Sequence, residues 1–380
     1  MSGVYSWSRF GGRTLAAAAG HEGAPTKLIF VVTKRCHSRC VYCDIWKVKD
    51  TPGGLDNELS LAEVDSLAHA NPFLQWIDFT GGEPTDRPDF VEVIQAFAKA
   101  CPDLLLVHFP TNGIATKRIH ETVAQLRKTV KARLIVTVSI DGPPELNDKL
   151  RGIRNDFAHA IDTFAAVRRR IGAENTYVGM TLHGHKAYCG RTSSELVEDT
   201  FAAINSALAN RNEAPIDWGT FHLNIPHFSQ HYYGNQANRA DETFGGVEHR
   251  AEVAAAIEAT ATRSHTGASL AMRGFERIYR AEARRYLATG RTQITCSALL
   301  STAYLSEKGE VYPCTIWDRP LGNVRTTGYA LMPLIEAARR DGTRRAVAEG
   351  KCPNCWTPCE AYPAIMASPL RSTLALITGS

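Results

Sequence analysis

Six short runs of apolar and β-branched residues alternate with segments of helical periodicity, and this alternation constrains the fold most. The runs predict strands at Leu28–Thr33, Trp76–Thr80, Leu104–Phe109, Leu134–Ile140, Tyr177–Leu182 and Phe221–Ile225. Helical patterns lie between them, near residues 61–70, 87–100, 116–129, 156–171 and 193–210. Strands that alternate with helices form a parallel sheet with right-handed crossovers. Because a closed (β/α)8 barrel needs eight strands, we predict an α/β fold with an open, partial (β/α)6 TIM-like barrel.

The pattern changes after residue 226, and we expect a smaller second unit there. Residues 247–290 predict two helices, and the chain from Thr292 onward combines short strands, turns and five cysteines. The small unit is therefore expected to be a cysteine-rich α+β domain. The expected division is an N-terminal extension (1–26), the partial barrel (27–235), a helical connector (236–290), the cysteine-rich domain (291–365) and a C-terminal tail (366–380).

Length, charge and hydropathy exclude several classes of protein. A chain of 380 residues with 44% apolar content can bury a large core. A net charge of +4 is too small to indicate a nucleic-acid or membrane partner. No run approaches the roughly 18 apolar residues of a membrane span, and Leu15–Ala19 is too short for the apolar region of a signal peptide. We therefore expect a soluble, cytoplasmic protein.

The ten cysteines are clustered along the chain. Three lie within residues 36–43 and five within 296–359, and only Cys101 and Cys189 stand apart. Disulfide frameworks are typical of small secreted domains, whereas clustered cysteines in a long chain without a signal peptide indicate metal-bound thiolates. Cys189 has two interpretations, a hydrogen-atom donor to a product radical or a small apolar residue of the core.

The first cysteine group has the spacing C-x3-C-x2-C and comprises Cys36, Cys40 and Cys43, directly after the first predicted strand. A 4Fe–4S cluster takes one protein ligand per iron, so three thiolates leave one iron open for a small molecule. A zinc site is the alternative interpretation of the same spacing. Unusual turns follow the next predicted strands, at Gly81–Pro84, Thr111–Gly113 and Asp141–Pro144. Ligands bind at such carboxyl ends of parallel strands.

Cysteines at this spacing, with Tyr42 before the last of them and Gly-Gly-Glu-Pro after the next strand, resemble the radical S-adenosylmethionine (radical SAM) enzymes. The resemblance covers roughly residues 27–226. It implies that the open iron binds the amino and carboxylate groups of S-adenosylmethionine (SAM). One electron from the cluster then yields methionine and a 5′-deoxyadenosyl radical, which takes a hydrogen atom from the substrate.

The resemblance also implies which residues contact SAM. Tyr42 matches an aromatic residue near the adenosine, and the two glycines permit backbone approach to the ammonium group with Glu83 as its anionic partner. The run Ser139-Ile-Asp-Gly followed by Arg151 resembles a motif of radical SAM maturases in which the serine and arginine reach the ribose or carboxylate. Asn147 stands where that motif has histidine, so no role is transferred to it. The implied SAM-binding residues are Tyr42, Gly81, Gly82, Glu83, Pro84, Asn112, Ser139, Asp141 and Arg151.

The second cysteine group resembles the auxiliary-cluster module of the SPASM and twitch proteins. It has the pattern C-x12-G-x4-C around Gly309, followed by C-x2-C and one further cysteine. A full SPASM module holds two clusters on about seven cysteines, so five imply a single auxiliary 4Fe–4S cluster. Its ligands would be Cys296, Cys314, Cys352 and Cys355. Cys359 is then a spare thiol, either a substitute ligand or structural, and a zinc ribbon is the alternative to the cluster.

A cluster with four protein ligands cannot easily bind substrate, so its expected role is electron acceptance during net oxidation. The segment before the first strand, about 26 residues, is too short for a leader-peptide module, which favours a small organic substrate, as in aminocyclitol dehydrogenases of antibiotic pathways. A peptide maturase and a zinc-stabilised binding module are the alternatives. An electron donor such as flavodoxin or ferredoxin is the expected partner. Its docking surface would be a stripe of four arginines on the second connector helix: Arg273, Arg277, Arg280 and Arg284. The alternative interpretation of this stripe is a solvated helix face.

Polar side chains near the ends of the last two predicted strands are candidates for the substrate site. His222 and His227 are the candidate catalytic residues, because a histidine there could take a proton from a substrate radical. Hydrogen-bonded structural histidines are the alternative. The other candidates are His183, His185, Asn224, His231, Tyr232 and Tyr233.

Overall fold

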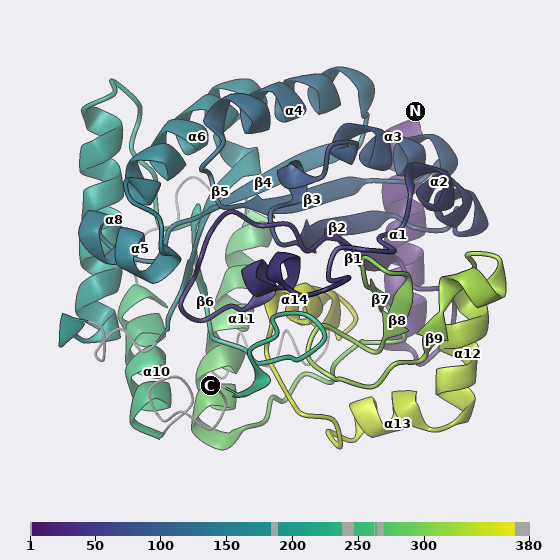
Figure 1. Ribbon diagram of the computed structural model, residues 1–380. Helices are drawn as coiled ribbons and strands as arrows, with labels where there is room; N and C mark the ends of the chain where they lie inside the picture. Colours follow the sequence, from purple (N-terminus) through teal and green to yellow (C-terminus); the bar gives the residue numbers. More distant parts are fainter. Residues whose placement is uncertain (1, 184–188, 238–246, 262, 264–269, 369–380) are drawn as a thin grey trace.

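In the computed structural model, the described residues are 2–183, 189–237, 247–261, 263 and 270–368 (Figure 1). They build one nine-stranded sheet with the order β6-β5-β4-β3-β2-β1-β7-β8-β9. The first six strands are parallel, and they are β1 (Lys27–Thr33), β2 (Trp76–Gly81), β3 (Leu106–Thr111), β4 (Arg133–Ser139), β5 (Thr176–Thr181) and β6 (Phe221–Asn224). The predicted partial barrel is confirmed.

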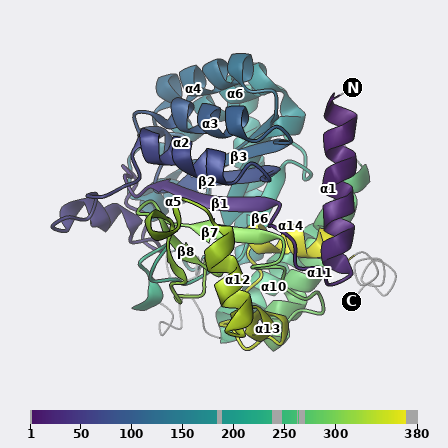
Figure 2. The same ribbon diagram turned by 90° about the vertical axis from the view of Figure 1, so that its right-hand side faces the viewer.

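Helices cover the outer face of this sheet, where a core rich in phenylalanine lies (Figure 2). They are α2 (Leu61–Ala70), α3 (Phe90–Ala100), α4 (Thr116–Thr129), α6 (Asp156–Ile171) and α8 (Ser193–Ala209). The predicted bounds agree to within three residues. The largest difference is the start of α3, where Pro88 and Asp89 precede the helix and Phe90 begins it, because a proline restricts the residue before it.

Two helices, α1 and α5, were not predicted. α1 (Ser2–Ala18) contains Gly11 and Gly12, which weaken a helical pattern. Arg13 attaches it to the barrel by donating to the carbonyl oxygens of Phe73 (2.5 Å) and Ala24 (2.7 Å). α5 (Pro144–Arg151) follows the turn at Asp141 and is only eight residues long, so its sequence reads as part of the turn.

The segment after residue 290 joins the same sheet. β7 (Thr302–Leu305) pairs parallel to β1, with Lys27 opposite Thr302, and β8 (Glu310–Tyr312) and β9 (Gly322–Asn323) follow in antiparallel pairing. The remaining elements include α10 (Val247–Ala261), α11 (Leu270–Thr289), α12 (Met332–Arg340), α13 (Thr343–Ala348) and α14 (Pro358–Met366). α11 and α14 contribute to a second core beside β4–β6. Within the described residues, no helix has the length and apolar character needed to span a membrane.

Candidate functional site

The cysteine loop leaves the carboxyl end of β1 and is held by backbone hydrogen bonds. The amides of Arg39 and Val41 each donate, over 2.9 Å, to the carbonyl oxygens of Arg151 and Leu150 in α5. The amide of Asp44 donates to the Tyr233 carbonyl, also over 2.9 Å. The loop is thus attached on both sides, and Cys36, Cys40 and Cys43 in it are free thiols.

The turn after β2 packs directly against this loop. Gly81 has a φ of +139°, and a Cβ built on it would lie 2.1 Å from the Thr33 carbonyl oxygen. A Cβ on Gly82 would lie 2.1 Å from the carbonyl oxygen of Arg35 and 3.0 Å from Cβ of Cys36. Only glycine permits such an approach of two backbones. The predicted contact of these glycines with SAM stays a prediction.

Glu83 joins the ends of β2 and β3. Its buried carboxylate accepts hydrogen bonds from Thr85 Oγ1 (2.6 Å), Thr111 Oγ1 (3.0 Å) and the Asn112 amide (2.7 Å). Burial raises the pKa of this carboxyl. Asn112 in turn accepts from the Ile114 amide at its Oδ1 (3.0 Å). Glu83 therefore fixes the turn, whether or not it also meets a ligand.

Three of the residues that the sequence assigns to SAM form one buried network. The Tyr42 hydroxyl donates to Oδ2 of Asp141, and Arg151 Nη1 donates to the same carboxylate oxygen over 2.7 Å. Arg151 also lies 3.2 Å from Asp156 through its Nε. Asn147 completes the network, because its Oδ1 accepts from the Asp141 amide and its Nδ2 donates to Asp156, each over 2.8 Å.

Sequence reasoning assigned no role to Asn147, which stands at a motif position that usually holds histidine, and it missed Asp156, which belongs to no recognisable motif. The departure from histidine at Asn147 was noted, and the structure shows an amide that bonds two acidic residues. His183 was assigned to the substrate site. Its ring stacks on Tyr42, with centroids 3.3 Å apart and planes 12° from parallel, and its place in the substrate site stays a prediction.

Cysteines of the second group come together around a small apolar cluster. Cys314 is buried with Ile316 and Val347, and Cys296 and Cys355 pack against them. Burial, Glu360 and the neighbouring thiols Cys314 and Cys352 all raise the pKa of Cys296, as expected for sulfur atoms that lie close together.

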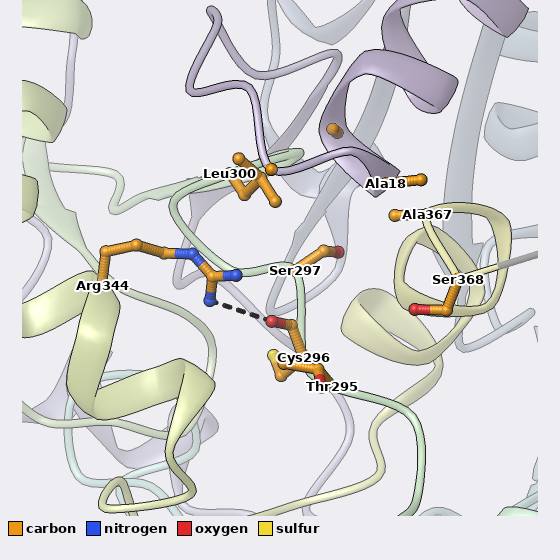
Figure 3. A pocket seen from close by; sticks show the side chains of 10 residues that line it. Ala18, Thr295, Cys296, Ser297, Leu300, Arg344, Ala367 and Ser368 are labelled. Carbon is orange, nitrogen blue, oxygen red and sulfur yellow. Dashed lines mark hydrogen bonds between the residues drawn. The ribbon is translucent and has the colours of Figure 1, made fainter. Parts of the chain in front are cut away.

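Arg344 donates to the Cys296 carbonyl oxygen over 3.0 Å and lines a pocket beside this group (Figure 3). Cys359 packs against a different apolar cluster from Cys296, Cys314 and Cys355. It packs with Cys43 and Tyr233 around the apolar side chains of β1.

Both cysteine groups fit iron–sulfur clusters by the chemistry of their donors. All their thiols are free, and burial first, then Glu83 and Cys40, raise the pKa of Cys36 to about 12. Among the described residues, no three His, Cys, Asp or Glu side chains surround a single metal-ion position. A cube spreads its thiolates over different irons, so its ligands need not converge on one point.

The inner face of the sheet is polar near its middle. His222 of β6 lies 3.1 Å from Glu276 of α11, measured from Nδ1 to Oε1. His108 of β3 lies 3.3 Å from Asp78 Oδ1 and 3.0 Å from Thr137 Oγ1. Both histidine side chains are partly exposed, at 18% and 25%.

Other candidate residues occupy more closed positions. His227 is half-buried, and desolvation lowers its pKa to about 4. His231 is buried 3.1 Å from Asp318 and from the Cys314 carbonyl oxygen. Tyr232 bonds Thr80 over 2.5 Å. Ser139, Asn224 and Tyr233 are partly buried, Pro84 is buried in the turn after β2, and His185 lies outside the described residues.

Two sequence interpretations were wrong. Cys189 is exposed, so it is not core filler. The arginine stripe of α11 is not a continuous solvated or docking face, because Arg280 is buried, 3.7 Å from Glu276, and donates to the Thr260 carbonyl over 3.0 Å.

Comparison with known proteins shows similarity in the barrel. Residues 30–187 match the family model described as the radical SAM superfamily. Mycofactocin maturase MftC of Mycobacterium ulcerans is 34% identical over 139 residues, which are 36% of this chain and 35% of that protein. Molybdenum cofactor biosynthesis protein 1 of Drosophila melanogaster is 30% identical over 178 residues, 46% of this chain and 27% of that protein. The matches thus span about a third of these relatives' length.

The fold itself is shared with solved structures. The structure described as native anSMEcpe with bound AdoMet and Cp18Cys peptide has a TM-score of 0.53 and 13% identity, covering 94% of this chain and all of that one. Streptococcus suis SuiB bound to the precursor peptide SuiA has a TM-score of 0.50 and 14% identity, covering 80% of this chain and 63% of that one.

Proposed function

Because residues 30–187 of this chain are a radical SAM domain, we propose that the protein is a radical SAM oxidoreductase that dehydrogenates a small organic molecule. Its cofactors are SAM, a 4Fe–4S cluster on Cys36, Cys40 and Cys43, and one auxiliary 4Fe–4S cluster. When bound, SAM and the first cluster supply a 5′-deoxyadenosyl radical that removes a hydrogen atom from the substrate.

The network behind the cysteine loop supports SAM binding beside it. The Arg151 guanidinium lies between two buried carboxylates, and Tyr42, a residue of the cysteine loop, joins the loop to that network. A polar network that is already ordered can orient a ligand without the free-energy cost of rearranging its own side chains. In this proposal Tyr42, Asp141 and Arg151 orient SAM, and Ser139 at the end of β4 lies on the same edge of the sheet. The same proposal assigns contacts with SAM to Gly81–Pro84 in the turn after β2 and to Asn112 in the turn after β3.

We propose net oxidation because Cys296, Cys314 and Cys355 lie close together and could hold an auxiliary cluster. With Cys352 they saturate four irons, so that cluster is suited to electron transfer rather than substrate binding. Loss of a hydrogen atom leaves a substrate radical. That radical becomes a stable product when it loses a proton and one further electron, and the auxiliary cluster is the electron acceptor. Cys359 packs against a different apolar cluster and is assigned no iron–sulfur cluster.

The substrate is proposed to lie against the inner face of β3–β6. His222, Asn224 and Thr137 are partly exposed there. Gly179 lies between them: a Cβ on it would be 3.0 Å from Thr137 Cγ2 and 3.5 Å from Asn224 Nδ2. The hydroxyl of Thr137, the amide of Asn224 and the imidazole of His222 surround a glycine here. They suit a small hydroxylated substrate, since buried polar groups need hydrogen-bond partners.

Iron analysis of anaerobically reconstituted protein tests this proposal. We expect about eight irons per chain, four per cluster. About four irons with one zinc would reject the auxiliary cluster, and zinc alone in colourless protein would indicate a binding module. Replacing Cys36, Cys40 and Cys43 together by alanine should remove about four irons and abolish 5′-deoxyadenosine formation. The matched control is Cys189→Ala, an exposed cysteine outside both groups.

A peptide maturase is the second candidate, favoured by the similarity to mycofactocin maturases. Product stoichiometry and substrate screening separate the two candidates. Oxidation of a small alcohol should form deoxyadenosine and oxidised product one to one, whereas repeated turnover per SAM indicates isomerisation. Modification of a precursor peptide, with no turnover of small alcohols, would favour the maturase.

A further inference from the structure

Two histidines line the inner face of the sheet, and their hydrogen-bond partners differ. Both ring nitrogens of His108 are engaged, Nδ1 with Asp78 and Nε2 with Thr137. His222 is held only at Nδ1, by Glu276. Within the described part of the chain, Nε2 of His222 has no protein partner, and the side chain keeps 18% exposure. Of the two histidines, only His222 therefore has a ring nitrogen available to a substrate.

The groups around the Glu276 carboxylate favour its ionised form. The carboxylate is 4% exposed, and burial alone would raise its pKa, but the hydrogen bonds from His222 and Tyr362 and the charge of Arg280 lower that pKa. The Tyr362 hydroxyl of α14 donates to Oε1, and Arg280 Nε lies 3.7 Å from Oε2. Three elements, β6, α11 and α14, thus meet at one carboxylate.

An ionised carboxylate only accepts hydrogen bonds, so the nitrogen of His222 that faces it carries the proton. The proton of the neutral ring is then on Nδ1, and Nε2 presents a lone pair to the inner face. The Tyr177 ring lies 4.8 Å from the imidazole, centroid to centroid, and restricts its orientation. A general base oriented by a buried acid through its other nitrogen is a recurrent catalytic arrangement.

We propose that Glu276 and Tyr362 are positioning residues that make Nε2 of His222 the proton acceptor for oxidation of a secondary alcohol. The inference rests on the proposed function. Removal of a hydrogen atom from the carbinol carbon leaves a carbon radical. Its hydroxyl proton passes to Nε2, the remaining electron passes to a one-electron iron–sulfur acceptor, and the C–O bond becomes C=O. The imidazolium then releases its proton to solvent, so the substrate loses two electrons and two protons in total.

The tautomer of His222 tests the inference without a substrate. The holoenzyme is labelled with ¹⁵N-histidine, and the His222 signals are identified by their loss in His222→Gln. We expect the Nδ1–H tautomer to exceed the Nε2–H tautomer by about tenfold or more in long-range ¹H–¹⁵N spectra, the ratio that one charged hydrogen bond supplies. A majority of Nε2–H, or a ring doubly protonated throughout the neutral and mildly alkaline range, would overturn it.

Two variants test the positioning roles. In Glu276→Gln the amide is best placed with its carbonyl toward Arg280 and its NH2 toward His222, so we expect the tautomer to invert to Nε2–H. An unchanged tautomer would contradict the inference. In Tyr362→Phe the ratio of the Nδ1–H to the Nε2–H tautomer of His222 should fall but stay above one. This variant still tests the inference if Glu276→Gln does not fold. Unchanged iron content verifies folding in both.

The exposed pair of His69 and Asp65 in α2 provides a matched control. Its side chains are 52% and 51% exposed, so water competes for the contact, and Asp65→Asn should leave the His222 signals unchanged. The experiments also distinguish failure of the proposed function from failure of this inference. Absence of deoxyadenosine in the wild-type protein would end the proposed function but leave the tautomer result, whereas an Nε2–H tautomer would end only this inference.

Discussion

At the scale of single residues, the site depends on a few buried charges whose partners are fixed. The Arg151 side chain is 6% exposed and lies between Asp141 and Asp156, which are 2% and 0% exposed. Ions removed from water need partners of opposite charge and further hydrogen bonds. Asn147 donates one to the Asp156 carboxylate, and its Oδ1 accepts from the backbone amide of Asp141. The network therefore stabilises the fold and shapes the region beside the cysteine loop at once.

Arg151→Met should be strongly destabilising. It leaves two buried carboxylates without their cation, and breaking a buried ion pair costs about 3–5 kcal/mol. We expect this loss in urea unfolding, together with weaker SAM binding in calorimetry. Arg133→Met is the control, because Arg133 bonds Asn175 at the surface, and it should cost about 1 kcal/mol or less. Equal stability of the two variants would contradict the assigned role.

The packing of Cys359 gives a second prediction. Cys359→Ala should retain the iron of both clusters, because its side chain packs with Cys43 and Tyr233 rather than with the apolar cluster that Cys355 contacts. Cys355→Ala should lose about four irons per chain. Iron and sulfide analysis checks both. Loss of iron in the Cys359 variant would identify it as a ligand instead.

At the scale of elements, the site is formed by close contact between turns at the carboxyl ends of neighbouring strands. The turn after β2 lies on the cysteine loop after β1, and α5 holds that loop from the other side. Each contact involves backbone atoms, so it tolerates little change of volume. The loop thus acquires its shape from its neighbours rather than from its own local sequence.

Gly82→Ala should displace the cysteine loop. The added Cβ would lie 2.1 Å from the Arg35 carbonyl oxygen, which cannot move without the chain around Cys36. We expect lower iron content on reconstitution and slower deoxyadenosine formation. Gly274→Ala is the matched control, since nothing lies within 4 Å of its Cβ position in α11. That variant should gain about 0.5–1 kcal/mol from helix propensity.

At the scale of the whole molecule, the cysteine-rich segment is part of the barrel sheet. β7 extends the sheet beyond β1, and the buried Lys27 Nζ donates over 2.7 Å to Asp78 in β2 and, over the same distance, to the Cys359 carbonyl oxygen in α14. The two cysteine groups are thereby placed in one structure, as electron transfer from the substrate requires.

A chain ending at residue 290 should therefore fail to fold alone. It would expose the hydrogen-bonding edge of β1 and the apolar side chains that Leu305 and Val311 cover, and such edges promote aggregation. We expect insoluble protein, measured by sedimentation and size-exclusion chromatography. A chain without residues 1–18 is the control and should stay soluble, because α1 contributes no strand. A monomeric, soluble 1–290 chain would contradict this prediction.

The hydrophobic periodicity of the sequence was sufficient to predict the barrel, because strands that alternate with helices bury their apolar faces by forming a parallel sheet covered by those helices. The start of α2 was equally local, since Ser60 and Glu63, three residues apart, form a capping box there. Short helices were missed where their residues also suit turns, as in α5. The pairing of β7 with β1 was missed because strands far apart in sequence carry no mutual signal.

By itself, the sequence determined the strand and helix segments of the parallel barrel, the cysteines of both groups and the resemblance to radical SAM enzymes, because these depend on local spacing. Only the tertiary structure decided that Asn147 and Asp156 complete the Arg151 network and that Glu276 faces His222. These contacts join residues of separate elements, and the partner of a buried polar group is set by packing rather than by neighbours along the chain.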